Sequence, residues 1–164
     1  MSTKADYSAD EWQLLLDVPP LIGTAVMMAG NSGLGTMKEA FAVASGVLGA
    51  RQGYEGNPLI ESLIDARLKE KDRSEVEKLN NQYRGMTAEQ ILDAALDKCR
   101  QAATLLAAKA TPQEAEQFKH WTLAVGQKVA EAAKEGGFLG IGGERVSENE
   151  RNALARIEEA LHSV

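Results

Sequence analysis

The first of two glycine-rich stretches that could bind phosphate reads GNSGLGTMKEAF and starts at Gly30. A phosphate-binding P-loop has the pattern G-x-x-x-x-G-K-[ST], in which glycine amides surround the phosphates and the lysine ammonium reaches them. Here the outer glycines have that spacing, but the hydroxyl residue comes first and the lysine follows two positions later. The stretch therefore predicts a tight turn between helices, with an anion site at a helix N-terminus as the alternative. The candidate ligand residues of that site are Gly33, Gly35, Thr36 and Lys38.

The second stretch, KEGGFLGIGGERVSENE at residues 134–150, has five glycines in eight positions. A dinucleotide-binding loop has three glycines, as G-x-G-x-x-G, between a strand and a helix. Gly140 and Gly142 supply two of them, but the third is absent and Glu144 would repel a phosphate. The element that precedes the loop is also a predicted helix instead of a strand. We therefore predict a hinge between two helices. The alternative is a phosphate-binding loop, in which Gly140 and Gly142 are the candidate ligand-binding residues.

Metal ligation and nucleophilic catalysis have few candidate residues in this chain. The two histidines are His120 and His162, and Glu159 precedes the second at the Glu-x-x-His spacing of di-iron helical bundles. Such a site needs a second pair and two more inward carboxylates, whereas the inward positions here are apolar. The lone Cys99 lies on an apolar helix face, which predicts a buried thiol and excludes an internal disulfide. We predict no metal, no cofactor and no catalytic residue, and we expect Glu116 and His120 to form a surface pair.

Composition and charge limit the function further. The 164 residues carry a net charge of −6 without a stripe of lysine and arginine, which argues against nucleic-acid binding. The N-terminus lacks the apolar core of a secretory signal, so we predict a cytoplasmic protein. Residues 18–37 carry no formal charge, but their two prolines and four glycines favour a buried helix and a turn over a membrane span. We expect one domain over residues 1–164, with 1–7 as a flexible tail.

Helix starts are marked by capping residues. Four segments match the capping box, in which a Ser or Thr and a Glu or Gln three positions later bond to each other's backbone amides. These segments begin at Ser8, Thr87, Thr111 and Ser147. Asn57, followed by Pro58, predicts a fifth start. Within the first helix, Pro19 and Pro20 predict a kink or a restart, because neither proline has an amide proton.

Apolar residues recur every three or four positions along much of the chain, which is the period of an amphipathic helix. The clearest stripes are Leu92, Leu96, Cys99, Ala103 and Leu106; Phe118, Trp121, Val125, Val129 and Ala132; and Leu154, Ile157 and Leu161. Further helices are predicted over 34–49, 58–68 and 74–84. No segment alternates as a strand does, so the predicted fold class is all-α, a helical bundle of about six or seven helices with no sheet.

Two blocks of the sequence resemble a family of uncharacterised bacterial proteins. The first is ADEWQLLLDVPPLIGTAVMMAGNSGLGTMKEAFAV, with its Glu-Trp opening. The second is WTLAVGQKVAEAAKEGGFLGIGGERVSENERNALARIEEAL, whose Gly-Gly-Phe-Leu-Gly motif precedes a Val-Ser-Glu helix start. Together they cover about half of the chain. The resemblance implies a bacterial all-helical protein and implies no activity and no site residue.

Well-marked helices without a catalytic motif favour a non-catalytic protein-interaction or regulatory module. We expect it to act as a homodimer or with a protein partner, through an apolar helix face left open at 34–49 or 58–68. The alternative is a small-ligand or anion-binding protein, an enzyme included, with a pocket near Lys38 and the glycine-rich loops. Peripheral membrane attachment through residues 18–37 is a third and weaker hypothesis.

Overall fold

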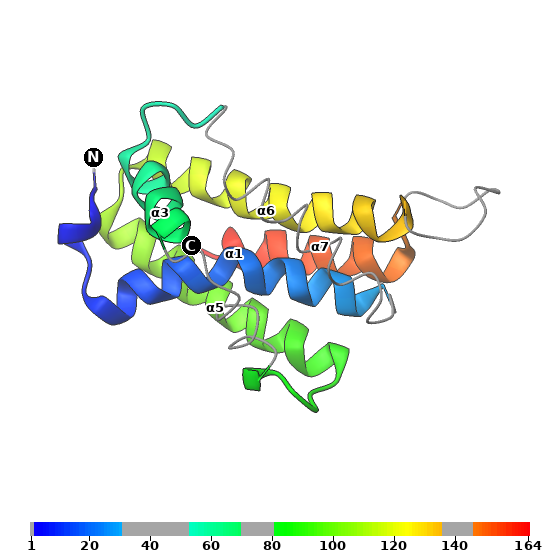
Figure 1. Ribbon diagram of the computed structural model, residues 1–164. Coiled ribbons are helices and arrows are strands. Elements are labelled where there is room, and N and C mark those ends of the chain that lie inside the picture. Colours follow the sequence, from blue (N-terminus) through cyan, green and yellow to red (C-terminus); the bar gives the residue numbers. More distant parts are fainter. Residues whose placement is uncertain (1, 31–52, 70–80, 136–145) are drawn as a thin grey trace.

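The computed structural model describes residues 2–30, 53–69, 81–135 and 146–164 (Figure 1). These residues form five α-helices, one short 3₁₀-helix and no strand. The elements are η1 (Lys4–Asp6), α1 (Ala9–Ala29), α3 (Pro58–Lys69), α5 (Ala88–Lys109), α6 (Pro112–Glu135) and α7 (Glu148–Leu161). The all-α prediction is confirmed for this part of the chain. Five helices are fewer than the six or seven predicted, and the predicted helices on either side of α3 lie wholly or mostly outside the described residues.

α1 lies at the centre of the bundle, and α5, α6 and α7 pack around it (Figure 1). α3 lies across the N-terminal halves of α1 and α6 and contacts both. Among the described helices, α1 alone is long and apolar enough to cross a membrane by length and composition, but 72% of that window is buried inside the fold. In this fold the uncharged residues of α1 therefore lie mostly inside the core.

Each helix start predicted from a capping residue is confirmed. At the start of α1, the Ser8 hydroxyl oxygen accepts from the Glu11 amide at 3.2 Å, and a Glu11 carboxylate oxygen accepts from the Ser8 amide at 2.7 Å. The same reciprocal pairs form at Thr87–Gln90, Thr111–Glu114 and Ser147–Glu150. At α3, the Asn57 side chain accepts from the Ile60 amide at 3.1 Å. Each cap satisfies an amide that the first helical turn leaves without an intrahelical partner.

α1 continues through Pro19 and Pro20 as a single helix, so the predicted restart is wrong. A proline at position 20 removes the amide that would donate to the Leu16 carbonyl. In this fold the Arg67 guanidinium, from α3, donates to that carbonyl instead. The carbonyl therefore keeps a hydrogen-bond partner at the gap, and the helix does not end there.

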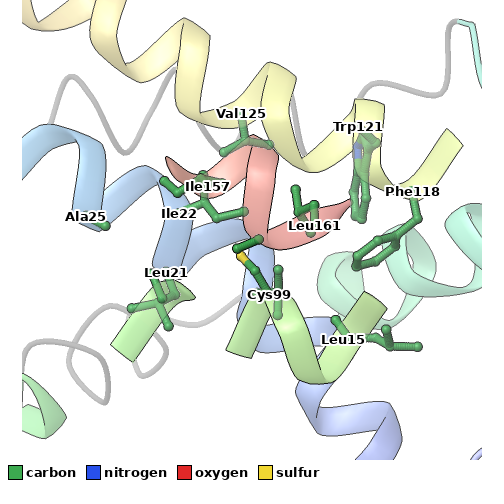
Figure 2. Close-up of a cluster of buried hydrophobic side chains, with 14 of the residues drawn as sticks. Leu15, Leu21, Ile22, Ala25, Cys99, Phe118, Trp121, Val125, Ile157 and Leu161 are labelled. Atoms are coloured by element: carbon green, nitrogen blue, oxygen red, sulfur yellow. The ribbon is translucent and has the colours of Figure 1, made fainter. Parts of the chain in front are cut away.

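The described residues share one hydrophobic core, made by the facing stripes of the five helices (Figure 2). The predicted stripe positions on α5, α6 and α7 are buried, except that Ala132 and Leu154 are partly exposed. The largest fully buried side chains include Leu15, Ile22, Phe118, Trp121 and Ile157. Burying one such apolar side chain contributes about 1.5–3 kcal/mol relative to leaving it in water.

Large apolar side chains are nearly absent from the surface of the described residues, where only Leu68 (44%) and Val164 (64%) are exposed. The large apolar residues of α3 that precede Leu68 are fully buried, namely Leu59, Ile60, Leu63 and Ile64. This face of α3 packs into the core, so the helix does not present the open apolar face that the homodimer prediction required of 58–68. The other suspected face, over 34–49, lies outside the described residues.

Residues 2–7, predicted to be a flexible tail, lie against the bundle. The Ser2 amide donates to a Glu114 carboxylate oxygen at 2.7 Å, and the Tyr7 hydroxyl donates to the Ser2 hydroxyl at 3.0 Å. The Lys109 ammonium donates to the Asp6 carbonyl at 3.1 Å. Ser2 and Tyr7 are both buried. The segment is therefore fastened where α5 ends and α6 begins.

Glu114 is a buried acid whose pKa makes the stability of the fold depend on pH. Burial raises the pKa of its carboxyl, but hydrogen bonds from the Thr111 and Ser2 amides and the Thr111 hydroxyl hold it below the ordinary value of 4.5. Such a carboxylate stabilises the fold above its unfolded pKa and loses that contribution as the pH falls through the folded pKa. We therefore expect Glu114→Gln to lower the free energy of unfolding by about 1.5 kcal/mol near neutral pH. The difference should shrink as the pH falls below 4.5.

Urea unfolding curves recorded from acidic to neutral pH measure this difference. Glu159→Gln, on the exposed face of α7, is the matched control because it removes the same charge away from any buried contact. A loss in Glu114→Gln that is equal at every pH would contradict the role given to the ionised carboxylate.

Candidate functional site

The six residues predicted as candidate ligand-binding positions all lie outside the described residues. They are Gly33, Gly35, Thr36, Lys38, Gly140 and Gly142. The structure therefore does not bear on the predicted pocket, and both glycine-rich loops stay sequence predictions.

Cys99 is fully buried in the core, as predicted, and burial raises its pKa to about 12. Figure 2 shows its sulfur among the apolar side chains of the core. Only the thiolate is a strong nucleophile, so a thiol with this pKa at this depth is a packing residue.

Glu116 pairs with residues other than the predicted His120. Its carboxylate accepts from the Lys119 ammonium at 2.8 Å and lies 3.6 Å from the Nε2 atom of His162. The hydrogen bond from Lys119 is the main cause that lowers the pKa of Glu116. The predicted pair is wrong because Lys119 and His162, which follows α7, occupy the two carboxylate oxygens. Among the described side chains, no group of three or more His, Cys, Asp or Glu could hold a metal ion.

Polar side chains gather around an open hollow of about 460 Å³ between α1 and α5, which we call the α1–α5 groove. Its lining residues are Asp10, Glu11, Gln13, Leu14, Asp17, Lys98 and Gln101. Positions 10, 13, 14 and 17 recur at helical spacing and so share one face of α1, and positions 98 and 101 share one face of α5. The opposite face of α1, with Trp12, Leu15 and Leu16, is buried in the core. The core packing of the two helices therefore sets the width of the groove.

Hydrogen bonds and ion pairs hold most of the charged side chains of the groove. Asp17 accepts from the Gln13 side-chain nitrogen at 2.7 Å and lies 3.6 Å from the Lys98 ammonium. The second contact joins α1 to α5 across the groove. Glu11 accepts from the Lys109 ammonium at 2.6 Å, and this hydrogen bond is the main cause of the lowered pKa of Glu11.

The lining of the groove has three carboxylates and one ammonium. Two of the carboxylates pair with Lys98 and Lys109, so among the described residues Asp10 supplies the unpaired negative charge of the lining. Asp10 is exposed and has no hydrogen bond or ion pair within the described part of the chain. None of the lining residues is buried, so no carboxyl is desolvated in the way that a general acid usually is. The arrangement offers carboxylates to a cationic group. None of these residues was among the predicted site residues.

Comparisons with protein-family models, with curated proteins and with solved structures found no match for this chain. The resemblance of its two sequence blocks to a bacterial helical family therefore stays a prediction.

Proposed function

We propose that this protein is a non-catalytic interaction module that binds a protein partner through the α1–α5 groove. The observation that carries the proposal is the groove itself, in which three carboxylates and one ammonium line an open hollow between two helices. Both helices contribute to the core, so the backbone beneath these side chains is already in place before a partner arrives. A preorganised site loses less conformational freedom on binding, which favours affinity.

The partner segment is basic. Lysine or arginine side chains are attracted at long range by the net charge of −6 and at short range by the groove carboxylates. Asp10 offers a carboxylate that no other described residue pairs with. Leu14 offers an apolar contact for the methylene stem of a lysine.

A second copy of the chain is the other partner that we considered, in a homodimer. Dimerisation through the apolar face of α3 has no support, because that face is buried within the fold. A homodimer that uses residues 34–49 stays a prediction. Native mass spectrometry of the purified protein distinguishes a monomer from a dimer, and would also detect a retained ligand.

We also infer that the protein is a cytoplasmic bacterial protein with six or seven helices. The thiol of Cys99, which is buried and not in a disulfide, supports a cytoplasmic location. The two sequence blocks that resemble a bacterial family support a bacterial origin. The helical spacing of apolar residues over 34–49 supports a sixth helix. No observation on the described residues favours the alternative ligand site near Lys38.

Titration with a labelled oligolysine peptide tests the proposed groove. Oligoglutamate of the same length is the probe of opposite charge. The double variant Asp10→Asn with Asp17→Asn removes two charges from the lining. We expect it to weaken oligolysine binding about fivefold to tenfold, since each exposed carboxylate–ammonium pair is worth up to about 1 kcal/mol. Added salt should weaken the binding of the unmodified protein, because exposed charge pairs are screened.

The matched control is Glu158→Gln with Glu159→Gln, which removes two charges from the exposed face of α7. We expect this variant to bind oligolysine nearly as well as the unmodified protein. Equal losses in the two variants would mean that the peptide responds to net charge alone, and would overturn the assignment of the groove.

A further inference from the structure

We infer that α3 holds α1 together as one helix across Pro19 and Pro20, and that Arg67 is the residue through which it does so. The inference starts from a deficit in α1. In a helix each amide donates to the carbonyl four residues earlier, so Pro20 leaves the Leu16 carbonyl without its donor. The proline ring also pushes against that carbonyl, which turns it outward and makes it accessible to another group.

Water is a poor substitute donor at this point. Leu16, Pro19 and Pro20 are all buried, and a buried carbonyl without a partner is costly. The Arg67 guanidinium, 51 residues along the chain, donates to the Leu16 carbonyl. Arginine suits the task because its planar group presents several donors and stays charged at any physiological pH.

α3 is anchored at its other end as well. The Asn57 side-chain nitrogen donates to the Gln117 side-chain oxygen on α6 at 2.8 Å. Between the two polar contacts, the buried apolar face of α3 packs into the core. Figure 1 shows α3 running between α6 and α1, with its C-terminal end toward α1. The helix therefore acts as a clamp that joins α6 to the proline gap of α1.

The clamp has a consequence at the α1–α5 groove. Asp17 lies inside the span from Leu16 to Pro20 and makes the ion pair with Lys98 across the groove. Loss of the Arg67 contact would free the helix to bend at this span and would shift Asp17 away from Lys98. α3 thus controls the geometry of the groove from the opposite side of α1; this step, unlike the clamp itself, rests on the proposed function.

A double-mutant cycle in urea unfolding tests the clamp. Arg67→Met keeps an apolar stem and removes the donor, and Pro20→Ala restores an amide that can donate to the Leu16 carbonyl within the helix. We expect Arg67→Met to raise the unfolding equilibrium constant about tenfold or more in the unmodified protein, because the lost bond has a charged donor. In the Pro20→Ala background the same substitution should raise it by a clearly smaller factor.

Pro19→Ala is the control background, because its restored amide donates to the Leu15 carbonyl and leaves the Leu16 carbonyl without a donor from the helix backbone. The cost of Arg67→Met should therefore stay large there. The clamp would be overturned if Arg67→Met cost the same stability in the unmodified, Pro20→Ala and Pro19→Ala proteins. It would also be overturned if Pro20→Ala and Pro19→Ala reduced that cost equally. If Arg67→Met alone does not fold, the clamp requires that Pro20→Ala restores folding and that Pro19→Ala does not.

Oligolysine titration of the same proteins tests the step to the groove. Arg67→Met removes a positive charge, so charge alone predicts tighter binding of the cationic peptide. We expect weaker binding, restored by Pro20→Ala, because the groove loses its geometry. Tighter binding in both backgrounds would overturn this step. An unmodified protein that does not bind oligolysine would refute the proposed function and leave the unfolding cycle intact, since the cycle uses no ligand.

Discussion

Trp121→Ala is expected to lower the free energy of unfolding by about 3–5 kcal/mol. Trp121 is fully buried on α6, and its ring meets that of Phe118 at a steep angle with the centroids 6.0 Å apart. The substitution removes the transfer free energy of the indole and leaves a cavity at the contact between α6 and its neighbours. Urea unfolding followed by circular dichroism measures the loss as a lower midpoint with an unchanged slope.

Trp121→Phe separates the packing of this side chain from its polar atom. The indole Nε1 is buried and has no hydrogen-bond partner among the described residues, and a buried donor left unpaired costs about 1–3 kcal/mol. Phenylalanine keeps an aromatic ring at the site and removes that donor. We therefore expect Trp121→Phe to lower stability by less than about 1.5 kcal/mol. A loss as large as that of Trp121→Ala would mean that the indole has a partner that the described residues do not reveal.

The helix starts could be predicted from the sequence because capping is local. The Ser8 hydroxyl and the Glu11 carboxylate meet across three residues, so the spacing of the residue types contains the whole interaction. The buried stripes were predictable for the same reason, since the helical period places their members on one face. The predicted number of helices remains open where the chain lies outside the described residues.

The errors arose where a distant residue changes a local rule. Two prolines end most helices, but Arg67 donates to Leu16 from 51 residues away and the helix continues. Likewise, the spacing of Glu116 and His120 suggested a pair, but helix packing brings His162 to within 3.6 Å of the carboxylate. The other carboxylate oxygen accepts from Lys119, a local neighbour on α6. A single sequence contains the residue types of such contacts and does not contain their distances.

The α1–α5 groove was not predicted, although part of its signal was present. Asp10, Gln13 and Asp17 lie at helical spacing on the face of α1 opposite the apolar residues. That pattern also describes any solvated helix face, so it does not single out a site. What distinguishes the groove is that α5 places Lys98 across from Asp17, which depends on the packing of the two helices.

Helix packing at Gly126 leads to the second large effect. A Cβ atom at this position would lie 2.9 Å from the Cγ2 atom of Ile22 on α1 and 3.0 Å from the Cδ2 atom of Leu154 on α7. Three helices therefore meet where α6 has no side chain. We expect Gly126→Leu to lower the free energy of unfolding by about 2–3 kcal/mol, because the larger side chain must force these helices apart. Leucine is a good helix former, so helix propensity cannot explain such a loss.

Gly23→Ala is the matched control, because Gly23 also lies inside a helix and faces α6. A Cβ atom there would lie 3.4 Å from Val129 and 3.6 Å from Val125, which are ordinary contact distances. We expect this variant to gain about 0.5–1 kcal/mol, since alanine loses less backbone entropy than glycine when a helix forms. A stability loss in Gly126→Ala as well as in Gly126→Leu, beside a gain in Gly23→Ala, would show that close helix approach fixes Gly126. A gain in both alanine variants would mean that α1, α6 and α7 are not packed this tightly.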